Sequence, residues 1–294
     1  MKLCVGFRPV SFSCVSVALC CSMNTPAIEL QPGSYTPAPA GNTVLDLTYA
    51  HLRRDALYKQ GNKMPGEFLL EMNMVQLRSR HYLNDVSYNQ SIGFSLYCGQ
   101  TQGLRDVAYW GRRTGCADLL LGTTLWPLVD HKRQIYFGLT PYVTLPTGQY
   151  DANSPFNLGE NRWTIGLNTG YSRPINEYWQ WELMGDLQAY GENDAYLGTH
   201  TLKQEPLGSL QFHLRYNINK QARVFASYLQ DWGGETSIDD KPQHNSRNNS
   251  RYRLGYAYRA TPALLLQLSW GADIHVENGM REDQRLLLRS VWMF

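Results

Sequence analysis

The chain ends with Arg285-Leu-Leu-Leu-Arg-Ser-Val-Trp-Met-Phe294, in which apolar and polar residues alternate. One face of this stretch carries Leu286, Leu288, Ser290, Trp292 and Phe294. The opposite face carries Arg285 and Arg289. An alternation with a period of two predicts a β-strand whose two faces meet different surroundings.

Four more segments show the same alternation, at 179–190, 207–216, 251–259 and 264–273. In each segment one face is aliphatic with aromatic residues near its ends, and the other face is polar, charged or glycine. Soluble β-sandwiches also alternate in this way. The pattern therefore predicts strands, but alone it does not choose between a sandwich and a membrane barrel.

The length and spacing of the predicted strands favour the barrel. They are about ten residues long, as a tilted strand must be to cross a bilayer, whereas strands in sandwiches average roughly five or six. Short turns alternate with longer polar links, as in outer-membrane barrels with short periplasmic turns and long extracellular loops. Twelve strands are predicted, near 43–53, 69–82, 87–98, 117–128, 134–145, 163–173, 179–190, 206–217, 222–231, 251–260, 263–273 and 283–294.

The composition agrees with a barrel. Only 18% of the residues are charged, the formal net charge is +2 and the mean hydropathy is −0.41. Beyond the N-terminus we find no apolar run of roughly 20 residues, which a membrane-spanning helix would need. The near-neutral charge argues against nucleic acid as a partner, because nucleic-acid binding uses a basic face. Since lipid leaves no backbone polar group unpaired, we expect an all-β, closed, antiparallel up-and-down barrel of about 12 strands.

Such a barrel is expected in the outer membrane of a Gram-negative bacterium, in contact with outer-membrane lipid and lipopolysaccharide. Trp292 and Phe294 close the last strand with aromatic residues. This ending looks like the signal by which the barrel assembly machinery recognises its substrates, so that machinery is a second expected partner.

The N-terminal residues predict three parts of the chain. Residues 1–27 combine a basic start, a short apolar stretch and small residues up to Ala27, which is typical of a secretory signal peptide. Cleavage after Ala27 would leave residues 28–42 as a segment that either lies in the periplasm or plugs the lumen. The barrel itself is predicted at 43–294.

Two of the six cysteines, Cys98 and Cys116, follow the predicted signal peptide. They flank a glycine-rich polar segment, and an even pair in an oxidising compartment favours a disulfide at the base of a loop. The alternative is two free thiols. The Cys and His spacings do not resemble a zinc site, and we expect neither a metal nor a cofactor.

Two adjacent motifs, Pro146-Thr-Gly-Gln-Tyr-Asp151 and Asn157-Leu-Gly-Glu-Asn-Arg-Trp163, carry a resemblance. They resemble the signature of the outer-membrane family named "putative meta-pathway of phenol degradation", also similar to the outer-membrane transporter family. In that family a strand ends in Pro-x-Gly-x-Tyr-Asp, and Asn-x-Gly-x-Asn-Arg-Trp opens the next strand. The resemblance covers residues 30–294 and implies an outer-membrane channel associated with the degradation of aromatic compounds.

The motif residues have a structural and a functional interpretation. Glycine and the short polar side chains support turns, Arg162 can pair with Asp151 or Glu160, and Trp163 can anchor the strand at the membrane interface. The alternative is direct contact with a solute. The residues concerned are Pro146, Gly148, Tyr150, Asp151, Asn157, Gly159, Asn161, Arg162 and Trp163.

The face predicted to line the lumen is rich in charge. Its basic members are Arg215, Arg223, Arg251, Arg253, Arg259, Arg285 and Arg289. Its acidic members are Glu182, Asp186, Asp231 and Asp273. These charges either brace the lumen as ion pairs or form an electropositive track for anionic solutes.

An enzyme is not expected, because no Gly-x-Ser-x-Gly motif occurs and no His is patterned to face Ser290 on the lipid side. We expect passive uptake of small solutes, with hydrophobic or aromatic compounds favoured by the family resemblance. One alternative is an anion-selective narrow porin for acidic oligosaccharides or organic acids. Another is a plugged barrel whose long loops mediate surface interactions. An apolar pocket inside the barrel would favour the uptake of hydrophobic compounds, and paired arginines in a blocked lumen would favour the plugged barrel.

Overall fold

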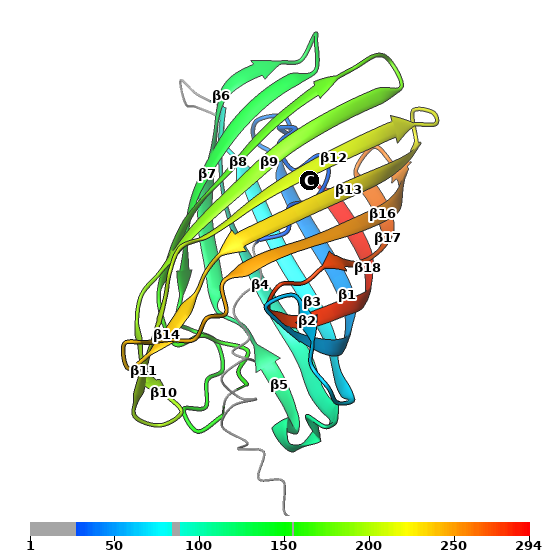
Figure 1. The fold of residues 1–294 in the computed structure, drawn as a ribbon. Helices are drawn as coiled ribbons and strands as arrows, with labels where there is room; N and C mark the ends of the chain where they lie inside the picture. Colours follow the sequence, from blue (N-terminus) through cyan, green and yellow to red (C-terminus); the bar gives the residue numbers. More distant parts are fainter. Residues whose placement is uncertain (1–27, 84–88, 155) are drawn as a thin grey trace, which may run out of the picture.

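The computed structural model describes residues 28–83, 89–154 and 156–294. Twelve long strands form a closed antiparallel barrel, which confirms the predicted fold (Figure 1). The barrel strands are β1 (Thr43–Lys59), β3 (Phe68–Tyr82), β4 (Asn89–Arg105), β6 (Leu119–Asp130), β7 (Ile135–Leu145), β8 (Thr164–Pro174), β9 (Trp179–Tyr190), β12 (Leu207–Asn217), β13 (Ala222–Gly233), β16 (Arg247–Thr261), β17 (Leu264–His275) and β18 (Gly279–Met293). The predicted signal peptide lies outside the described residues.

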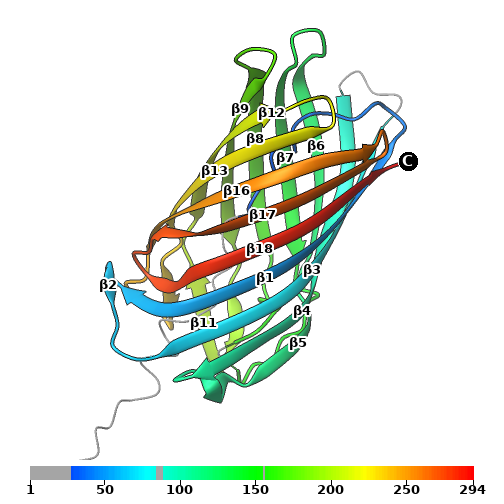
Figure 2. The same cartoon turned by 90° about the vertical axis from the view of Figure 1, so that its right-hand side faces the viewer.

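The first and last strands close the barrel. β1 and β18 run side by side in antiparallel register from Val44 opposite Met293 to Tyr58 opposite Gly279 (Figure 2). Beyond this ladder the backbones of Thr43 and Phe294 exchange two hydrogen bonds, of 3.0 and 2.9 Å. Closure leaves no free sheet edge in this region, which is the condition for a sheet to span a membrane.

Side chains alternate between the outer surface and the lumen as the sequence predicts. Leu266 and Leu268 of β17 are exposed on the outside, whereas Gln267 and Ser269 between them are buried inside. On β12, Gln211 and His213 are almost completely buried in the lumen. The apolar residues therefore form the outer face, which meets lipid. The polar residues of the inner face alternate with them, so the mean hydropathy of the chain is negative although the barrel has an apolar surface.

The two ends of the barrel differ. At the short-turn end, tight turns join neighbouring strands, and Thr43 and Phe294 lie there. At the opposite, long-loop end, strands on one side of the barrel extend further than predicted, since β1 and β4 are each 17 residues long. Within the described residues, no helix is long and apolar enough to cross a membrane.

The long-loop end is more regular than predicted. The predicted strands leave long links at 54–68, 99–115, 191–205 and 232–250, but these stretches are not plain loops. β1 and β4 extend into the first two, and short elements form within all four. The additional elements are β2 (Asn62–Lys63), the 3-10 helix η1 (Ala108–Trp110), β5 (Arg112–Cys116), β10 (Asn193–Tyr196), β11 (His200–Gln204), β14 (Thr236–Ile238) and β15 (Lys241–Pro242). β10, β11, β14 and β15 form a separate small sheet below the barrel wall (Figure 1).

Candidate functional site

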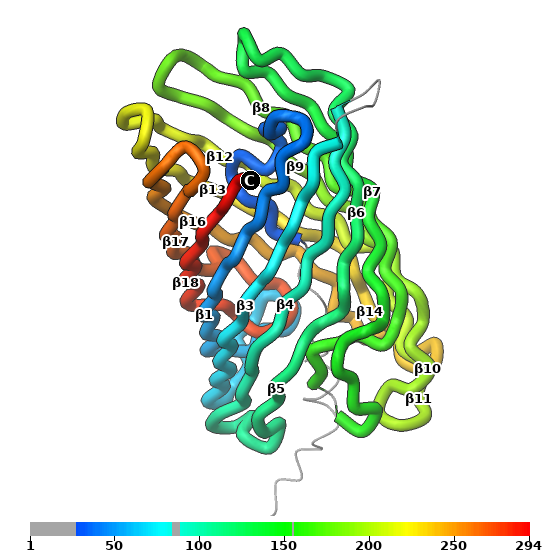
Figure 3. The backbone as a smooth tube through the Cα atoms, turned by 180° about the vertical axis from the view of Figure 1, so that it is seen from behind, coloured from blue at the N-terminus to red at the C-terminus, as the bar shows by residue number. Residues whose placement is uncertain are grey.

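Residues 28–40, which we call the N-terminal segment, run from the inside of the barrel, where Leu30 and Tyr35 bond to the wall, to its short-turn end before the chain enters β1 (Figure 3). Two apolar side chains of the segment, Leu30 and Tyr35, are buried and form a small core with Met184 of β9. The Tyr35 ring packs against Gly170 of β8, where a Cβ atom would collide with the ring. The absence of a side chain at Gly170 therefore creates the space that this ring occupies.

Hydrogen bonds from the barrel wall satisfy the backbone of the N-terminal segment. The Leu30 N–H donates to Oε1 of Gln211 at 2.9 Å, and the Gly33 N–H donates to Oε2 of Glu182 at 2.8 Å. The Tyr35 carbonyl accepts a 3.0 Å bond from Nε1 of Trp126. Because a buried backbone needs such partners, these contacts specify where the segment sits.

A charged side chain of the segment joins the wall as well. The Glu29 carboxylate lies 2.9 Å from Nη1 of Arg253 and 2.6 Å from Nη1 of Arg285. Arg285 also pairs with Glu282 on its own strand at 2.5 Å. Arg253 and Arg285, two of the predicted lumen arginines, thus share a carboxylate partner that comes from the N-terminal segment and not from a barrel strand.

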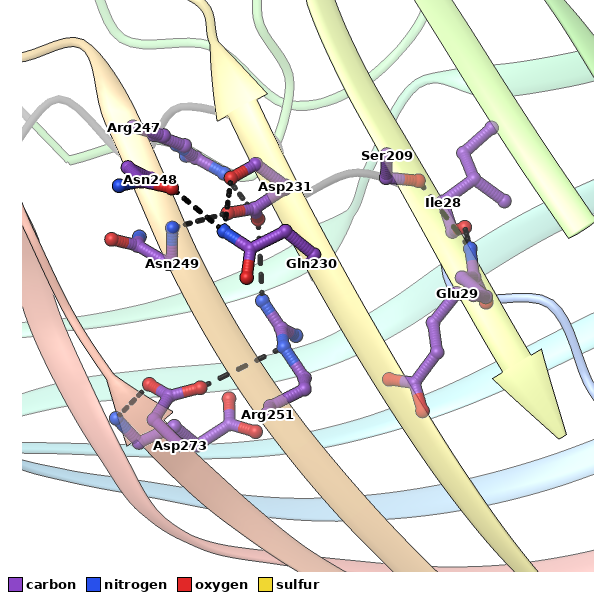
Figure 4. Close-up of polar contacts among 12 residues, drawn as sticks. Ile28, Glu29, Ser209, Gln230, Asp231, Arg247, Asn248, Asn249, Arg251 and Asp273 are labelled. Carbon is purple, nitrogen blue, oxygen red and sulfur yellow. Dashed lines mark hydrogen bonds and ion pairs between the residues drawn. The ribbon is translucent and has the colours of Figure 1, made fainter.

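A second set of ion pairs joins neighbouring strands of the wall (Figure 4). Arg251 of β16 lies 3.6 Å from Asp231 of β13 and 3.6 Å from Asp273 of β17. Arg247 approaches the same Asp231 at 3.8 Å. Buried charges of opposite sign are held together in this way, which is the bracing interpretation of the lumen charges.

The other predicted lumen residues lie on the same inner face. Arg215 pairs with Glu182 at 2.6 Å, and Arg289 pairs with Asp46 of β1 at 2.6 Å. Arg223 and Arg259 line a cavity at the short-turn end. Arg251, Arg253 and Arg289 thus all face carboxylates, so these three arginines do not form an unpaired track for anions.

Asp186 differs from the other lumen carboxylates. It accepts hydrogen bonds from the Tyr142 hydroxyl at 2.8 Å, from Nε2 of Gln188 at 2.6 Å and from the Ile28 N–H at 3.3 Å. Within the described residues, no ion pair with a basic side chain is seen for it. Its neighbours fix its position without supplying a countercharge.

Sequence reasoning missed part of the charged network and an apolar wall. Asp46, Arg54 and Arg78 face the lumen from β1 and β3, as do Glu29 of the segment and Glu282 of β18. The missed apolar residues of this wall are Ala50, Leu52, Leu70, Met72, Met74 and Leu287, all buried. The available signal was residues 69–83, where both faces of the predicted strand carry Met or Leu.

This apolar wall borders a cavity of about 300 Å³ on the long-loop side of the N-terminal segment. Ile28, Glu29 and Gln31 of the segment line the cavity. Arg251 and Arg285 line it as well. The volume is within the range of cavities that hold small ligands. The lumen thus contains a pocket with one apolar wall, whose lining also includes the charged residues Glu29, Arg54, Asp118, Glu160, Arg162, Arg251 and Arg285.

A second cavity, of about 510 Å³, lies on the other side of the segment. Residues of the segment from Pro32 to Pro39 line it, as do turn residues such as Gln134 and Pro262. The N-terminal segment therefore lies between the two cavities and separates an apolar space from one at the short-turn end.

The family motif folds as a loop over the apolar cavity. Asp118, just before β6, accepts hydrogen bonds from the N–H groups of Gly148 at 2.7 Å and Glu160 at 2.8 Å. Burial raises the pKa of Asp118, and these donors oppose that shift. Within the loop, the Asp151 N–H donates to Oδ1 of Asn157 at 2.8 Å. A residue outside the motif therefore holds its two halves together.

The remaining motif residues attach the loop to its surroundings. Arg162 pairs with Glu160 at 2.9 Å, while Asp151 lies 3.3 Å from Arg113 of β5. The Tyr150 hydroxyl donates to the Ala195 carbonyl at 3.0 Å, and Trp163 is exposed on the outer surface. Tyr150, Asn157, Gly159 and Arg162 also line the apolar cavity, whereas Pro146 does not.

The two cysteines lie opposite each other on β4 and β5, and a disulfide joins Cys98 and Cys116. The Cys116 carbonyl accepts a 2.9 Å hydrogen bond from the N–H of Gln149 in the motif loop. The disulfide hairpin and the motif loop are thus parts of one structure above the cavity.

Two observations bear on chemistry in the lumen. Nδ1 of His213 lies 2.7 Å from the Ser227 hydroxyl, and the two residues face each other across β12 and β13. Within the described residues, we see no group of three or more His, Cys, Asp or Glu side chains placed to hold a metal ion.

The predicted assembly residues lie at the barrel seam. Trp292 and Phe294 are both exposed on the outside, and the Phe294 backbone pairs with Thr43. Their side chains are therefore accessible from the membrane side.

Comparison with known proteins places the chain in a family. The COG4313 outer membrane channel from Pseudomonas putida F1 is 31% identical, with a TM-score of 0.86 over 90% of this chain and 100% of that chain. The transport unit of the autotransporter AIDA-I from Escherichia coli shares the fold alone, with 10% identity and a TM-score of 0.50 over 98% of this chain and 100% of that chain. No curated protein matches the chain. Because the family model described as "Putative MetA-pathway of phenol degradation" matches residues 42–289, the chain is an outer-membrane β-barrel that belongs to this family.

Proposed function

We propose that this protein is an outer-membrane channel for the passive uptake of small hydrophobic or aromatic compounds. The observation that carries the proposal is the cavity of about 300 Å³ with its apolar wall of β1, β3 and β18 residues. An apolar wall does not help a polar solute to bind. A small ring compound, in contrast, is stabilised by about 25 cal/mol for each Å² of apolar surface that it buries there. The family description and the channel of Pseudomonas putida F1 support the proposal.

The proposed mechanism has no covalent step and uses the barrel alone. A solute enters from the long-loop end, which is the extracellular end in outer-membrane barrels, and occupies the apolar cavity. Because the N-terminal segment lies between this cavity and the short-turn end, passage requires that the segment rearrange. Trp292 and Phe294 are proposed to serve in assembly, and outer-membrane lipid and lipopolysaccharide would surround the barrel.

Met74 provides a test, because it is buried in the apolar wall and lines the cavity. The Met74→Gln variant keeps the size of the side chain but adds polar atoms, whereas Met74→Leu keeps the wall apolar. We expect Met74→Gln to lower the initial rate of radiolabelled toluene uptake severalfold in cells that express the barrel, and Met74→Leu to leave it near wild type. Equal uptake with and without the wild-type barrel would contradict the proposal.

A plugged barrel is the second candidate, because the N-terminal segment contacts many strands of the wall. Planar-bilayer recordings separate the two candidates. Wild-type protein that never conducts, and does not take up toluene in cells, would favour the plugged barrel whose loops mediate surface interactions.

A further inference from the structure

Among the described residues, more positive than negative side chains line the cavity at the short-turn end. Six arginines line it, namely Arg78, Arg80, Arg215, Arg223, Arg259 and Arg289, together with a single carboxylate, Asp46. We propose that this arginine vestibule, meaning the cavity lined by these six side chains, is a binding site for a small oxyanion of the carboxylate or phosphate class. The proposal concerns this cavity and not the apolar one.

Two carboxylates form ion pairs with vestibule arginines in the described structure, Asp46 and Glu182. Asp46 is shared between Arg289, at 2.6 Å, and Arg78, at 3.9 Å. Glu182 pairs with Arg215 at 2.6 Å. In the described structure these six arginines therefore have two carboxylates as ion-pair partners, and a bound anion would supply part of the missing countercharge.

Several donors in the vestibule lack an anionic partner. Among the described residues, Arg223 makes no ion pair or hydrogen bond, and the charged groups that act on it most strongly are Arg215, Glu182, Arg259 and Arg289. In the part of the chain that the structure describes, Arg80 donates to the Ser34 carbonyl and Arg259 to the Pro262 carbonyl, and neither pairs with a carboxylate.

Two further donors are buried without a partner. They are the Nε atoms of Arg78 and Arg215, for which no hydrogen bond is seen in the described structure. A buried polar donor without a partner costs free energy, and a shift of either guanidinium group toward a bound oxyanion would recover part of that cost.

The charge surplus is confined to this end of the lumen. In the lumen network beside the apolar cavity, the five arginines Arg54, Arg247, Arg251, Arg253 and Arg285 pair with the four carboxylates Glu29, Asp231, Asp273 and Glu282. The lining of the cavity adds Arg162, which pairs with Glu160, and Asp118. That network is nearly neutral, whereas the vestibule is not. General bracing of the lumen therefore explains the first set of arginines, but in the vestibule it explains only Arg78, Arg215 and Arg289.

The ligand class follows from the side chains. The planar guanidinium group presents paired N–H donors that match carboxylate and phosphate oxygens. At about 510 Å³ the vestibule has room for inorganic phosphate or for an aromatic carboxylate such as benzoate. Asn217 and Gln134 add polar groups at the turn side, where a solute in the periplasm would enter.

Arg223 and Arg133 form a matched pair of positions for a test. Arg223→Gln removes one positive charge from the vestibule without breaking an ion pair, so the fold is not expected to suffer. Arg133→Gln removes the same charge from the neighbouring turn, where the Arg133 side chain is 78% exposed and outside the vestibule. Binding of inorganic phosphate and of benzoate is measured by calorimetry on the full barrel in a non-ionic detergent, with benzamide as the uncharged ring.

We expect phosphate and benzoate to bind saturably and benzamide not to bind at this site. Losing a charge-assisted hydrogen bond should weaken binding about tenfold in Arg223→Gln, while Arg133→Gln should stay within about twofold of wild type. Absence of saturable binding of both anions would overturn the proposal. The proposal would also be overturned if benzoate and benzamide bound with equal affinity and Arg223→Gln left the affinity for benzoate unchanged. The ring would then occupy the apolar cavity. This experiment measures binding and not transport. A failure of the anion-binding proposal can therefore be distinguished from a failure of the proposed uptake of aromatic compounds.

Discussion

The Glu29 carboxylate lies 2.6 Å from Nη1 of Arg285, although 256 positions separate these residues in the chain. This contact links the N-terminal segment to the strand that closes the barrel. Arg253 approaches the same carboxylate at 2.9 Å from another strand. One side chain of the segment thus neutralises charge on two strands, and the segment is part of the interior of the barrel.

Replacing this carboxylate should loosen the segment. Glu29→Gln leaves Arg253 and Arg285 with one partner fewer, and breaking a buried pair in this way costs about 3–5 kcal/mol. We expect a severalfold rise in the conductance of planar bilayers containing the variant. Glu67→Gln serves as a control, because the Glu67 side chain is 79% exposed. Conductance identical in wild type and both variants would show that Glu29 does not retain the segment.

The apolar anchor of the segment can be tested separately. A side chain at position 170 collides with the Tyr35 ring, so Gly170→Val should displace Tyr35 and expose its neighbours. With a reporter cysteine in place of the buried Gln31, we expect thiol labelling at least about tenfold faster in Gly170→Val, as for a local opening made easier by more than about 1.4 kcal/mol. Tyr35→Phe keeps the ring and removes only its 3.1 Å hydrogen bond with Thr140, so labelling should stay slow. Slow labelling in both variants would argue against this anchor.

The disulfide should stabilise the family motif loop rather than the barrel. Removing a cross-link that closes a loop of this size lowers stability by up to about 3 kcal/mol. In the Cys98→Ser, Cys116→Ser double variant we expect faster hydrogen exchange at the amides of Gln149 and Gly148. Amides in the β12 and β13 ladder, away from the hairpin, should keep their protection. Unchanged exchange at Gln149 would mean that the loop is held without the disulfide.

Processing of the chain should create a charge inside the lumen. If cleavage follows Ala27, the new amino group belongs to Ile28, whose nitrogen lies 3.3 Å from Oδ2 of Asp186. This ammonium would supply the cation that Asp186 lacks among the described residues. We expect the α-amino group of the mature protein to resist an amine-reactive reagent in the folded barrel and to react severalfold faster in Asp186→Asn.

Mass spectrometry of the labelled peptides gives the measurement. Lys220, in an exposed turn between β12 and β13, is the internal control and should react equally in both proteins. A mature protein that begins elsewhere than at Ile28, or an α-amino group that reacts as fast as Lys220 in wild type, would refute this prediction.

The sequence by itself determined the barrel. Alternation in segments such as 264–273 and 285–294 indicated which side chains face lipid, and the structure places Leu266, Leu268 and Trp292 on the outer surface. This works because side chains in a strand alternate strictly between two faces, so local order along the chain defines both surfaces. The count of twelve barrel strands follows from the same local pattern.

Only the tertiary structure decided what fills the lumen. Glu29, Arg253 and Arg285 are far apart in the sequence, and nothing in their local patterns pairs them. Likewise, Met72 and Met74 share a wall with Leu287 only because β18 returns to pair with β1 and β1 pairs with β3. Pairing and cavity formation depend on which strands meet across the closed barrel, and long-range closure, rather than local alternation, determines that.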